Sequence, residues 1–426
     1  MFVTVLCLSA FSALAPRLSA QQSSADWPMF QANPAHTGIG TGSPVLTPKP
    51  LWTYNFFAPV VSSPAVVDGV VYVGSDNSAV YALNSTSGVQ IWNYSITPAF
   101  PVYSSPAVAD GVVYVGSMNG IMYALNATNG AQIWSYNTGG PVASSPAVVN
   151  RVVYIGSGGG VSYVYALNAT NGAKLWRYTS SGYIIMSSPA VVSGVVYIGS
   201  TEGSTEFSTR GNVCALNAAT GTLLWNCTTN GRVTASPTVA DRAVYIGDDD
   251  GNVYALDAAN GDKLWNYTVG GAVEMSPVVA DGWVYIGGGN SMCALNATNG
   301  SKLWNYTANL LGVSPAFIGG VVYVGNLTAL NATDGVKLWS YDTDHFGSTT
   351  ASSPAVVNGV IYVAGGYLVY ALGNRPASSP LFLSSNALLV LVGVLVAIVV
   401  IAASTVLLFR KRLKTKPESP AAEETT

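Results

Sequence analysis

The sequence predicts an all-β fold, an eight-bladed β-propeller, on the basis of three observations. A segment of about 40 residues that opens with Ser-Pro recurs eight times, and seven of these copies end in a Trp-containing run; this is the period of a propeller blade. Each copy contains several short runs of β-branched and aromatic residues, the composition typical of strands. Before the C-terminal stretch, no segment has the apolar spacing of a helix. The openings lie at Pro64, Pro106, Pro146, Pro189, Pro237, Pro277, Pro315 and Pro354.

The first copy predicts the four strands of one blade, running from the axis outward. Residues 64–67 form a short apolar run, and Asp68-Gly69 is a hairpin dipeptide whose glycine accepts positive φ at little cost. Residues 70–74 and 80–83 are the second and third strands, and residues 91–94, with their Trp, are the fourth.

The ring is expected to close through the N-terminal end of the repeat region. The last third strand is predicted at residues 368–372, and no Trp strand follows it. An extra Trp strand instead precedes the first copy, at residues 51–54. We therefore expect residues 51–54 to pair with residues 368–372, because this closure removes two exposed strand edges. Seven blades with an open ring are the alternative.

The two ends of the chain predict a secreted, membrane-anchored topology. Residues 2–15 are apolar and precede a small-residue site, so residues 1–20 are predicted to be a signal peptide; the run is short for a membrane anchor, the alternative. An uninterrupted apolar stretch predicts a transmembrane helix, and the Arg and Lys residues after it place the tail in the cytoplasm. The expected order is signal peptide (1–20), N-terminal extension (21–50), propeller (51–372), linker (373–386), transmembrane helix (387–409) and cytoplasmic basic tail (410–426).

Asn-X-Ser/Thr sequons agree with an extracellular, plasma-membrane location. Charged residues are 9% of the chain, against about 25% in typical domains, so glycans would supply solubility. The alternative is that an Asn-rich repeat multiplies sequons by chance. Those predicted after the third strand lie on one face and those after the Trp lie on the outer rim, which leaves the opposite face and its central funnel for ligand contact. The candidates are Asn84, Asn93, Asn126, Asn168, Asn226, Asn266, Asn296, Asn305 and Asn331, with further sequons at Asn299 and Asn326.

A disulfide between Cys214 and Cys227 is predicted from the alignment of the repeats. Both cysteines replace tyrosines that most other copies carry in the third and fourth strands, such as Tyr254 and Tyr267. We expect antiparallel pairing to place the two cysteines directly opposite each other. The alternative is two independent apolar substitutions, and Cys293 is such a single substitution in the sixth copy.

The repeat resembles the PQQ-like propeller family. The segments Ala124–Trp134 and Ala255–Trp265 match that family's A-x-D-x-x-T-G-x-x-x-W pattern, with Asn often in place of Asp, and the opening Trp27-Pro28-Met29-Phe30 is similar to the segment that precedes such propellers. The resemblance covers roughly residues 26–372. It implies that the repeat tryptophans dock between neighbouring blades, and these are Trp52, Trp92, Trp134, Trp176, Trp225, Trp265, Trp304 and Trp339.

The resemblance leaves enzymatic activity open, and we expect none. The family contains quinoprotein dehydrogenases, which bind PQQ and calcium at the top of the funnel, and also scaffold propellers without a cofactor. This chain lacks the adjacent Cys-Cys pair and the long loop insertions of the enzymes. Its two histidines are His36, in the N-terminal extension, and His345, in the last loop before a blade. No catalytic residue is assigned, and PQQ and Ca²⁺ enter through the resemblance alone.

The loops at the funnel side are acidic. Glu202, Glu206 and Arg210 lie in the longest insertion, and Glu274 lies in a later loop. Asp248, Asp250 and Asn252 form a fragment of a calcium loop without its distal Glu, so a solvated turn is favoured over a metal site. Residues 21–386 carry 11 Lys+Arg and 17 Asp+Glu, which argues against nucleic-acid binding.

These observations favour a noncatalytic cell-surface propeller that presents its funnel face to a protein or a glycan. A degenerate PQQ-dependent oxidoreductase and a purely structural envelope protein are the alternatives.

Overall fold

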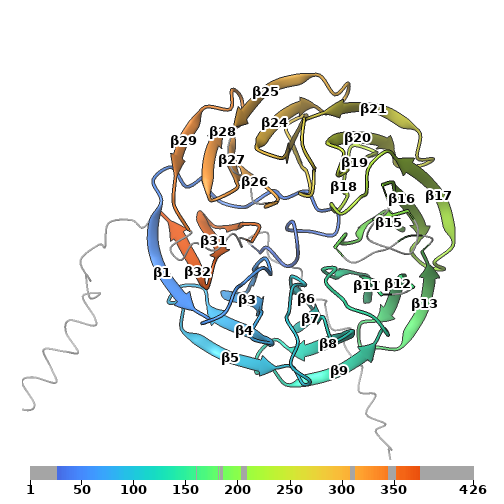
Figure 1. The fold of residues 1–426 in the computed structure, drawn as a ribbon. Coiled ribbons are helices and arrows are strands. Elements are labelled where there is room, and N and C mark those ends of the chain that lie inside the picture. The colour runs from blue at the N-terminus through green and yellow to red at the C-terminus, as the bar shows by residue number, and fades with distance from the viewer. Residues whose placement is uncertain are drawn as a thin grey trace, which may run out of the picture. The chain divides into compact units, whose positions relative to one another are not determined.

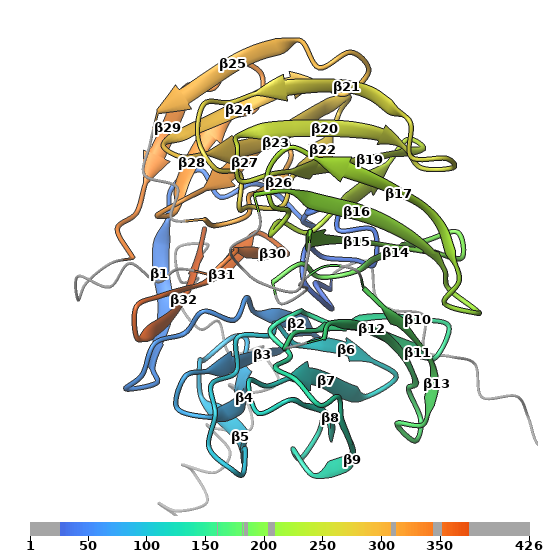
Figure 2. The same ribbon diagram turned by 45° about the vertical axis from the view of Figure 1, so that its right-hand side comes forward.

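The computed structural model describes residues 26–374 except 160, 181, 183–185, 203–208, 308–311 and 344–351. Its strands form eight four-stranded antiparallel sheets around a central axis, and successive sheets lie side by side around the ring (Figures 1 and 2). This arrangement confirms the predicted eight-bladed β-propeller. In the described part of the chain, no helix is long and apolar enough to cross a membrane. The predicted signal peptide, transmembrane helix and cytoplasmic tail lie outside the described residues.

Each blade runs outward from the axis through an inner, a second, a third and an outer strand. The inner strands are β2 (Ala65–Val67), β6 (Ala107–Ala109), β10 (Ala147–Val149), β14 (Ala190–Val192), β18 (Thr238–Ala240), β22 (Val278–Ala280), β26 (Ala316–Ile318) and β30 (Ala355–Val357). The second strands are β3 (Val70–Ser75), β7 (Val112–Gly116), β11 (Val152–Ser157), β15 (Val195–Thr201), β19 (Ala243–Gly247), β23 (Trp283–Gly288), β27 (Val321–Val324) and β31 (Val360–Gly365).

The third and outer strands complete the blades. The third strands are β4 (Ala79–Asn84), β8 (Ile121–Asn126), β12 (Tyr163–Asn168), β16 (Gly211–Asn217), β20 (Asn252–Asp257), β24 (Ser291–Asn296), β28 (Thr328–Asn331) and β32 (Leu368–Gly373). The outer strands are β5 (Gln90–Ser95), β9 (Gln132–Asn137), β13 (Lys174–Thr179), β17 (Leu223–Thr229), β21 (Lys263–Thr268), β25 (Lys302–Thr307), β29 (Lys337–Ser340) and, for the eighth blade, β1 (Lys49–Asn55).

The ring closes through β1, as the sequence predicted. β1 pairs antiparallel with β32, and Trp52 lies opposite Ala371. The eighth blade therefore joins the first and last strands of the propeller, in the order β1-β32-β31-β30. This pairing covers the outer edge of β32, which would otherwise present unpaired backbone groups.

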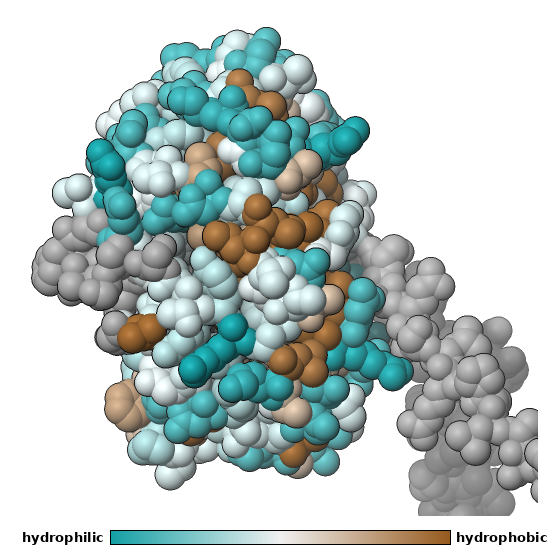
Figure 3. All heavy atoms as spheres, turned by 90° about the vertical axis from the view of Figure 1, so that its right-hand side faces the viewer, coloured by the Kyte–Doolittle hydropathy of each residue, from teal (hydrophilic) through white to brown (hydrophobic). Residues whose placement is uncertain are grey.

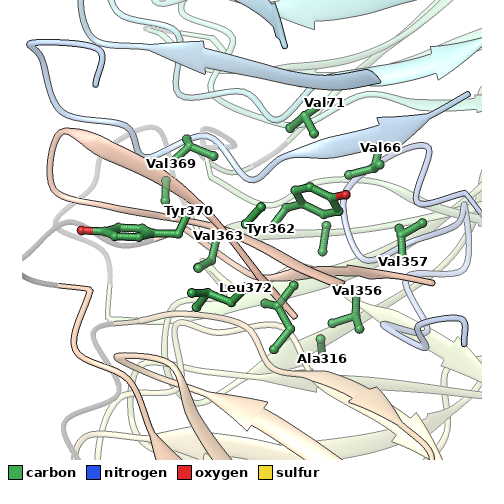
Figure 4. Packing of buried hydrophobic residues seen from close by; sticks show 14 of the residues in the cluster. Val66, Val71, Ala316, Val356, Val357, Tyr362, Val363, Val369, Tyr370 and Leu372 are labelled. Atoms are coloured by element: carbon green, nitrogen blue, oxygen red, sulfur yellow. The ribbon is translucent and has the colours of Figure 1, made fainter. Parts of the chain in front are cut away.

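The hydrophobic core lies between neighbouring blades. Second and third strands carry near-continuous apolar runs because both of their faces are covered by adjacent blades. At the junction of the eighth and first blades, Tyr362, Val363 and Val369 pack in one buried cluster with Val66 and Val71 (Figure 4). Apolar contact between the first and last blades thus adds to the strand pairing that closes the ring.

A β-bulge in every blade shifts the pairing of third and outer strands by one residue, and it overturns the predicted disulfide. In the fourth blade the shift falls between Ala215 and Leu216, so Trp225 lies opposite Ala215 and Cys227 lies opposite Val213. We expected Cys227 to lie opposite Cys214, but Cys214 pairs with Asn226 and both cysteines are free.

The two cysteines consequently face different neighbouring blades. Cys214 packs with Tyr154 and Trp176 of the third blade. Because successive side chains alternate across a strand, the one-residue shift in pairing places Cys227 on the opposite face of the sheet. Cys227 packs on the other face, with Tyr254 of the fifth blade. Each thiol thus replaces one ring of a tyrosine pair that elsewhere joins adjacent blades, such as Tyr94 and Tyr123, whose centroids are 5.8 Å apart.

Candidate functional site

The N-terminal segment of residues 26–48 lies in the central channel, where Figure 1 shows it as the blue trace inside the ring. Its backbone bonds to the exposed edges of six inner strands, belonging to the first, second, fourth, fifth, seventh and eighth blades. The contacts are Trp27 with Val66, Val108 N with Pro28 O, Val191 N with Pro34 O, Val239 N with Ala35 O, Phe317 N with Gly38 O, and Thr41 N with Val356 O. The segment therefore satisfies backbone groups that an empty channel would leave unpaired.

His36 is held inside this channel as a neutral group. The residue is 1% exposed, its Nδ1 lies 3.0 Å from the carbonyl oxygen of Pro237, and its ring meets Phe30 edge-on at 5.4 Å. Burial lowers the pKa of His36 from 6.5 to about 4. The sequence placed His36 in the N-terminal extension without a partner; the structure makes it part of the channel packing.

Eight serines form a closed ring of hydrogen bonds around the propeller axis. In each blade the serine before the opening proline of the repeat donates its backbone N–H to the hydroxyl oxygen of the corresponding serine in the next blade. The donor-to-acceptor distances are Ser63 to Ser105 2.9 Å, Ser105 to Ser145 2.9 Å, Ser145 to Ser188 2.9 Å, Ser188 to Ser236 2.8 Å, Ser236 to Ser276 3.1 Å, Ser276 to Ser314 2.9 Å, Ser314 to Ser353 3.2 Å and Ser353 to Ser63 3.1 Å.

Proline explains why the ring has this form. A residue before proline is restricted to extended backbone, which directs each serine across the gap to its neighbour. In the first blade the preceding residue, Ser62, accepts the N–H of Gly74 at 3.1 Å, which ties the loop to the second strand. The Ser-Ser-Pro triplet occurs in five of the eight blades, and Ala235, Met275 and Val313 replace its first serine in the fifth, sixth and seventh blades.

The ring forms the wall of a funnel of about 160 Å³, which we call the serine funnel. It opens on the face where outer strands return to inner strands. Phe30 of the channel segment contributes an aromatic surface, and Tyr103, Met186 and Glu274 join the lining from the loops. Among the lining residues within the described part of the chain, Glu274 is the single charged group, and neither Lys nor Arg is present. The described surface of the serine funnel therefore consists mainly of uncharged hydroxyl, aromatic and apolar groups, with one carboxylate.

The acidic residues singled out in the sequence do not gather into a metal site. Asp248 is fully buried and its carboxylate accepts from the N–H of Gly231 at 3.0 Å, the N–H of Asn252 at 2.8 Å and the hydroxyl of Tyr254 at 2.8 Å. Asp250 is exposed. Across the described residues, no group of three or more His, Cys, Asp or Glu side chains could hold a metal ion.

Asp248 and Asp249 both have structural partners. Asp248, in the fifth blade, stands at the repeat position that Ser75 holds in the first blade. Its carboxylate accepts hydrogen bonds from its own and the neighbouring loop. Asp249 forms a 2.7 Å ion pair with Arg232 and accepts from Thr234 at 2.9 Å. Glu202 is exposed on a neighbouring loop, whereas Glu206 and His345 lie outside the described residues.

The repeat tryptophans lie at the junctions between blades. Each indole N–H donates to a carbonyl in the turn after the third strand of the next blade: Trp52 to Ser85 2.7 Å, Trp92 to Ala127 2.9 Å, Trp134 to Ala169 2.8 Å, Trp176 to Ala218 2.9 Å, Trp225 to Ala258 3.1 Å, Trp265 to Ala297 2.9 Å and Trp304 to Ala332 2.8 Å. Trp339 donates instead to Val45 of the N-terminal segment, at 2.8 Å, because β1 supplies the outer strand there.

The candidate sequons divide into two structural groups. Asn93, Asn226, Asn266 and Asn305 are exposed on outer strands. The turn asparagines accept backbone N–H bonds within their own turns, as Asn168 does from Thr170 at 2.9 Å. Asn326 bonds with Asp342 and Thr343.

These features define a class of protein, a β-propeller with a serine-lined funnel and an N-terminal segment in its central channel. The sequence matches the family model described as outer membrane protein assembly factor BamB over residues 46–106, 99–226 and 209–412. These matches span most of the chain, so the chain belongs to the PQQ-like, BamB-type β-propeller repeat family. Among curated proteins, none matches the sequence significantly.

Several solved structures share the fold. Quinohemoprotein alcohol dehydrogenase from Comamonas testosteroni is 19% identical, with a TM-score of 0.69 over 82% of this chain and 80% of that one. BamB from Moraxella catarrhalis is 17% identical, with a TM-score of 0.61 over 77% of this chain and 100% of that one. A europium-containing methanol dehydrogenase is 13% identical, with a TM-score of 0.70 over 82% of this chain and 98% of that one. At these identities the likeness concerns the fold alone.

Sequence reasoning missed both the channel segment and the serine ring. The sequence carries a signal for the ring, because a serine precedes the proline in all eight copies, but the pattern alone indicates only the period of the repeat. Residues 26–48 have no periodic pattern, and their place depends on a channel that exists only in the closed ring.

Proposed function

We propose that this chain is a noncatalytic cell-surface propeller, anchored by one transmembrane helix at 387–409, that presents its funnel face to an extracellular protein or glycan. The observation that carries the proposal is the serine funnel. Its hydroxyl wall, Phe30 surface and open mouth offer hydrogen bonds and an aromatic contact, which is the kind of surface that small-ligand and partner recognition uses. Among the lining residues that the structure describes there is no histidine or cysteine that could act as base or nucleophile, and His345 lies outside the described residues.

The described residues do not fit PQQ and calcium. PQQ carries three carboxylates, and anion recognition uses Arg or Lys at short range, but the serine funnel has Glu274 and neither cation. Calcium takes six to eight oxygen ligands, whereas the Asp248 carboxylate is already occupied by hydrogen-bond donors of its own loop. An oxidoreductase function therefore has no support from these side chains.

Site-specific photo-crosslinking on the full-length chain in intact cells tests the proposal. A photoreactive side chain at Met186, which is 54% exposed at the funnel, is expected to capture a discrete protein or glycan. The matched control is Val89, which is 63% exposed beside the turn before β5; it is expected to capture nothing specific. Equal labelling at both positions, or quinone-dependent dye reduction by the purified chain with added PQQ and Ca²⁺, would contradict the proposal.

The orientation has its own test. A membrane-impermeant amine reagent applied to intact cells is expected to label Lys174 and Lys263, which are exposed on outer strands. It should leave Lys411 and Lys414 of the tail unlabelled. The reverse pattern would place the propeller in the cytoplasm and end the proposal.

A further inference from the structure

The outer strands carry a regular row of exposed aliphatic side chains. The residue just before seven of the eight docking tryptophans points away from the core, because the tryptophan points into it and side chains alternate; the exception is Leu51, before Trp52, which packs partly buried against the core. Figure 3 shows one side of the ring, where apolar atoms lie among polar ones on the surface. The exposed fractions are Ile91 48%, Ile133 46%, Leu175 51%, Leu224 49%, Leu264 53%, Leu303 41% and Leu338 43%.

In four of these strands the same outward face also carries a complete sequon. The asparagine lies two residues after the aliphatic residue, and the Ser or Thr follows two residues later. Residues two apart on a strand share a face and lie about 6.6 Å apart. The four sets are Ile91-Asn93-Ser95, Leu224-Asn226-Thr228, Leu264-Asn266-Thr268 and Leu303-Asn305-Thr307, and every one of these residues is exposed.

We propose that Asn93, Asn226, Asn266 and Asn305 carry N-linked glycans that lie over the aliphatic row and protect the outer strands from pairing with other chains. The inference rests on the proposed extracellular location. In the modification, the side-chain Nδ2 forms a bond to C1 of a lipid-linked sugar phosphate. The bond from C1 to the phosphate oxygen breaks, the lipid phosphate leaves, and Nδ2 loses one proton. The donor is that lipid-linked oligosaccharide.

Outer strands need such protection because each is the edge of its sheet. An exposed edge strand with apolar side chains is a template for intermolecular pairing, and proteins usually protect it with charge. This chain has little charge to use, since charged residues are 9% of its sequence. A glycan attached about 6.6 Å from the leucine covers both the side chain and the strand edge.

The fourth blade depends most on its glycan. In β21 and β25 the leucine of the row follows a lysine, Lys263 or Lys302. In β17 that position is Leu223, which is 45% exposed, beside Leu224 at 49%. The third blade has no sequon, but Arg177 takes the asparagine position and lies over the Tyr163 ring at 4.7 Å. Asn226 thus sits on the most apolar of the four edges.

Glycopeptide mass spectrometry of the full-length chain, produced in a secretory host with N-glycosylation, tests occupancy. We expect sugar on the peptides that contain Asn93, Asn226, Asn266 and Asn305. If these peptides are unmodified in a chain whose Lys174 and Lys263 label from outside the cell, the glycan inference fails and the cell-surface proposal stands. If the chain does not label from outside, the cell-surface proposal fails and the glycan inference fails with it.

Asn226→Gln tests the protective role. We expect a several-fold higher fraction of self-associated protein than in the unsubstituted chain, measured by light scattering at equal concentration, and rescue by adding Leu223→Lys. Asn266→Gln has Lys263 beside the leucine and should change self-association less. Thr170→Ala removes the Asn168 sequon, in a turn outside the row, and keeps the hydrogen bonds that Asn168 accepts; it is the matched control and should change self-association least. Equal self-association in the Asn226→Gln and Thr170→Ala proteins would overturn the protective role.

Discussion

The Cα of Gly130 packs against the face of the Trp92 indole, which comes from the preceding blade. A Cβ built on Gly130 would lie 2.7 Å from Cε3 of that ring, and the glycine has φ +72°. The same contact recurs between Gly88 and Trp52, and between Gly261 and Trp225. This glycine of the repeat therefore has two roles, since it permits the left-handed backbone and leaves room for the docking tryptophan.

Gly130→Ala is expected to destabilise the propeller more than the same change at a turn without a facing indole. The positive φ costs roughly 1–2 kcal/mol, and the overlap with Trp92 adds typically 1–3 kcal/mol. Gly111→Ala is the matched control, because Gly111 has φ +74° with nothing within 4 Å of the added Cβ. Urea unfolding followed by tryptophan fluorescence measures both. Equal losses would show that the backbone alone determines the cost.

Ser105→Ala is expected to open one link of the serine ring. Ser105 is 4% exposed and its hydroxyl accepts the N–H of Ser63, so alanine leaves a buried donor unpaired, at a cost of about 1–3 kcal/mol. Ser135→Ala, at an exposed position of β9, should change the free energy of unfolding by less than about 0.5 kcal/mol. Indistinguishable midpoints in urea would mean that water replaces the lost acceptor.

His36 is expected to make the folded state sensitive to acid. Its pKa is about 4 when folded and about 6.5 when unfolded, so between these values the unfolded chain binds the extra proton. The contribution of His36 to the free energy of unfolding is fully present above pH 6.5. It falls by about 3 kcal/mol as the pH drops to 4. Denaturant unfolding of the native chain and of His36→Gln across this range isolates it. Parallel stability curves for the two proteins would contradict the assignment.

The two cysteines of the fourth blade are expected to react as separate free thiols. Burial raises the pKa of the Cys214 thiol to about 12, and it also raises the pKa of the half-buried Cys227, with Lys263 opposing the rise. A thiol reagent at pH 8 should therefore modify Cys227 slowly in the folded chain and Cys214 only after unfolding. Cys227→Ser should remove the slow phase. A disulfide-linked peptide containing both residues would contradict the observed register.

The repeat predicted the fold because each blade is specified locally. Turn glycines, β-branched runs and a tryptophan recur within about 40 residues, and a count of strands was enough to place β1 beside β32. The register between third and outer strands was not predictable in the same way. The bulge between Ala215 and Leu216 reverses which face a side chain occupies, and no residue type in the turn signals it.

The sequence by itself determined the number of blades, the closing strand and the positions of the tryptophans, because these depend on contacts within one repeat or between adjacent copies. Only the tertiary structure decided the course of residues 26–48, the neutral burial of His36 and the serine funnel. Each of these depends on the channel that eight inner strands enclose, and such a channel exists only once the ring has closed.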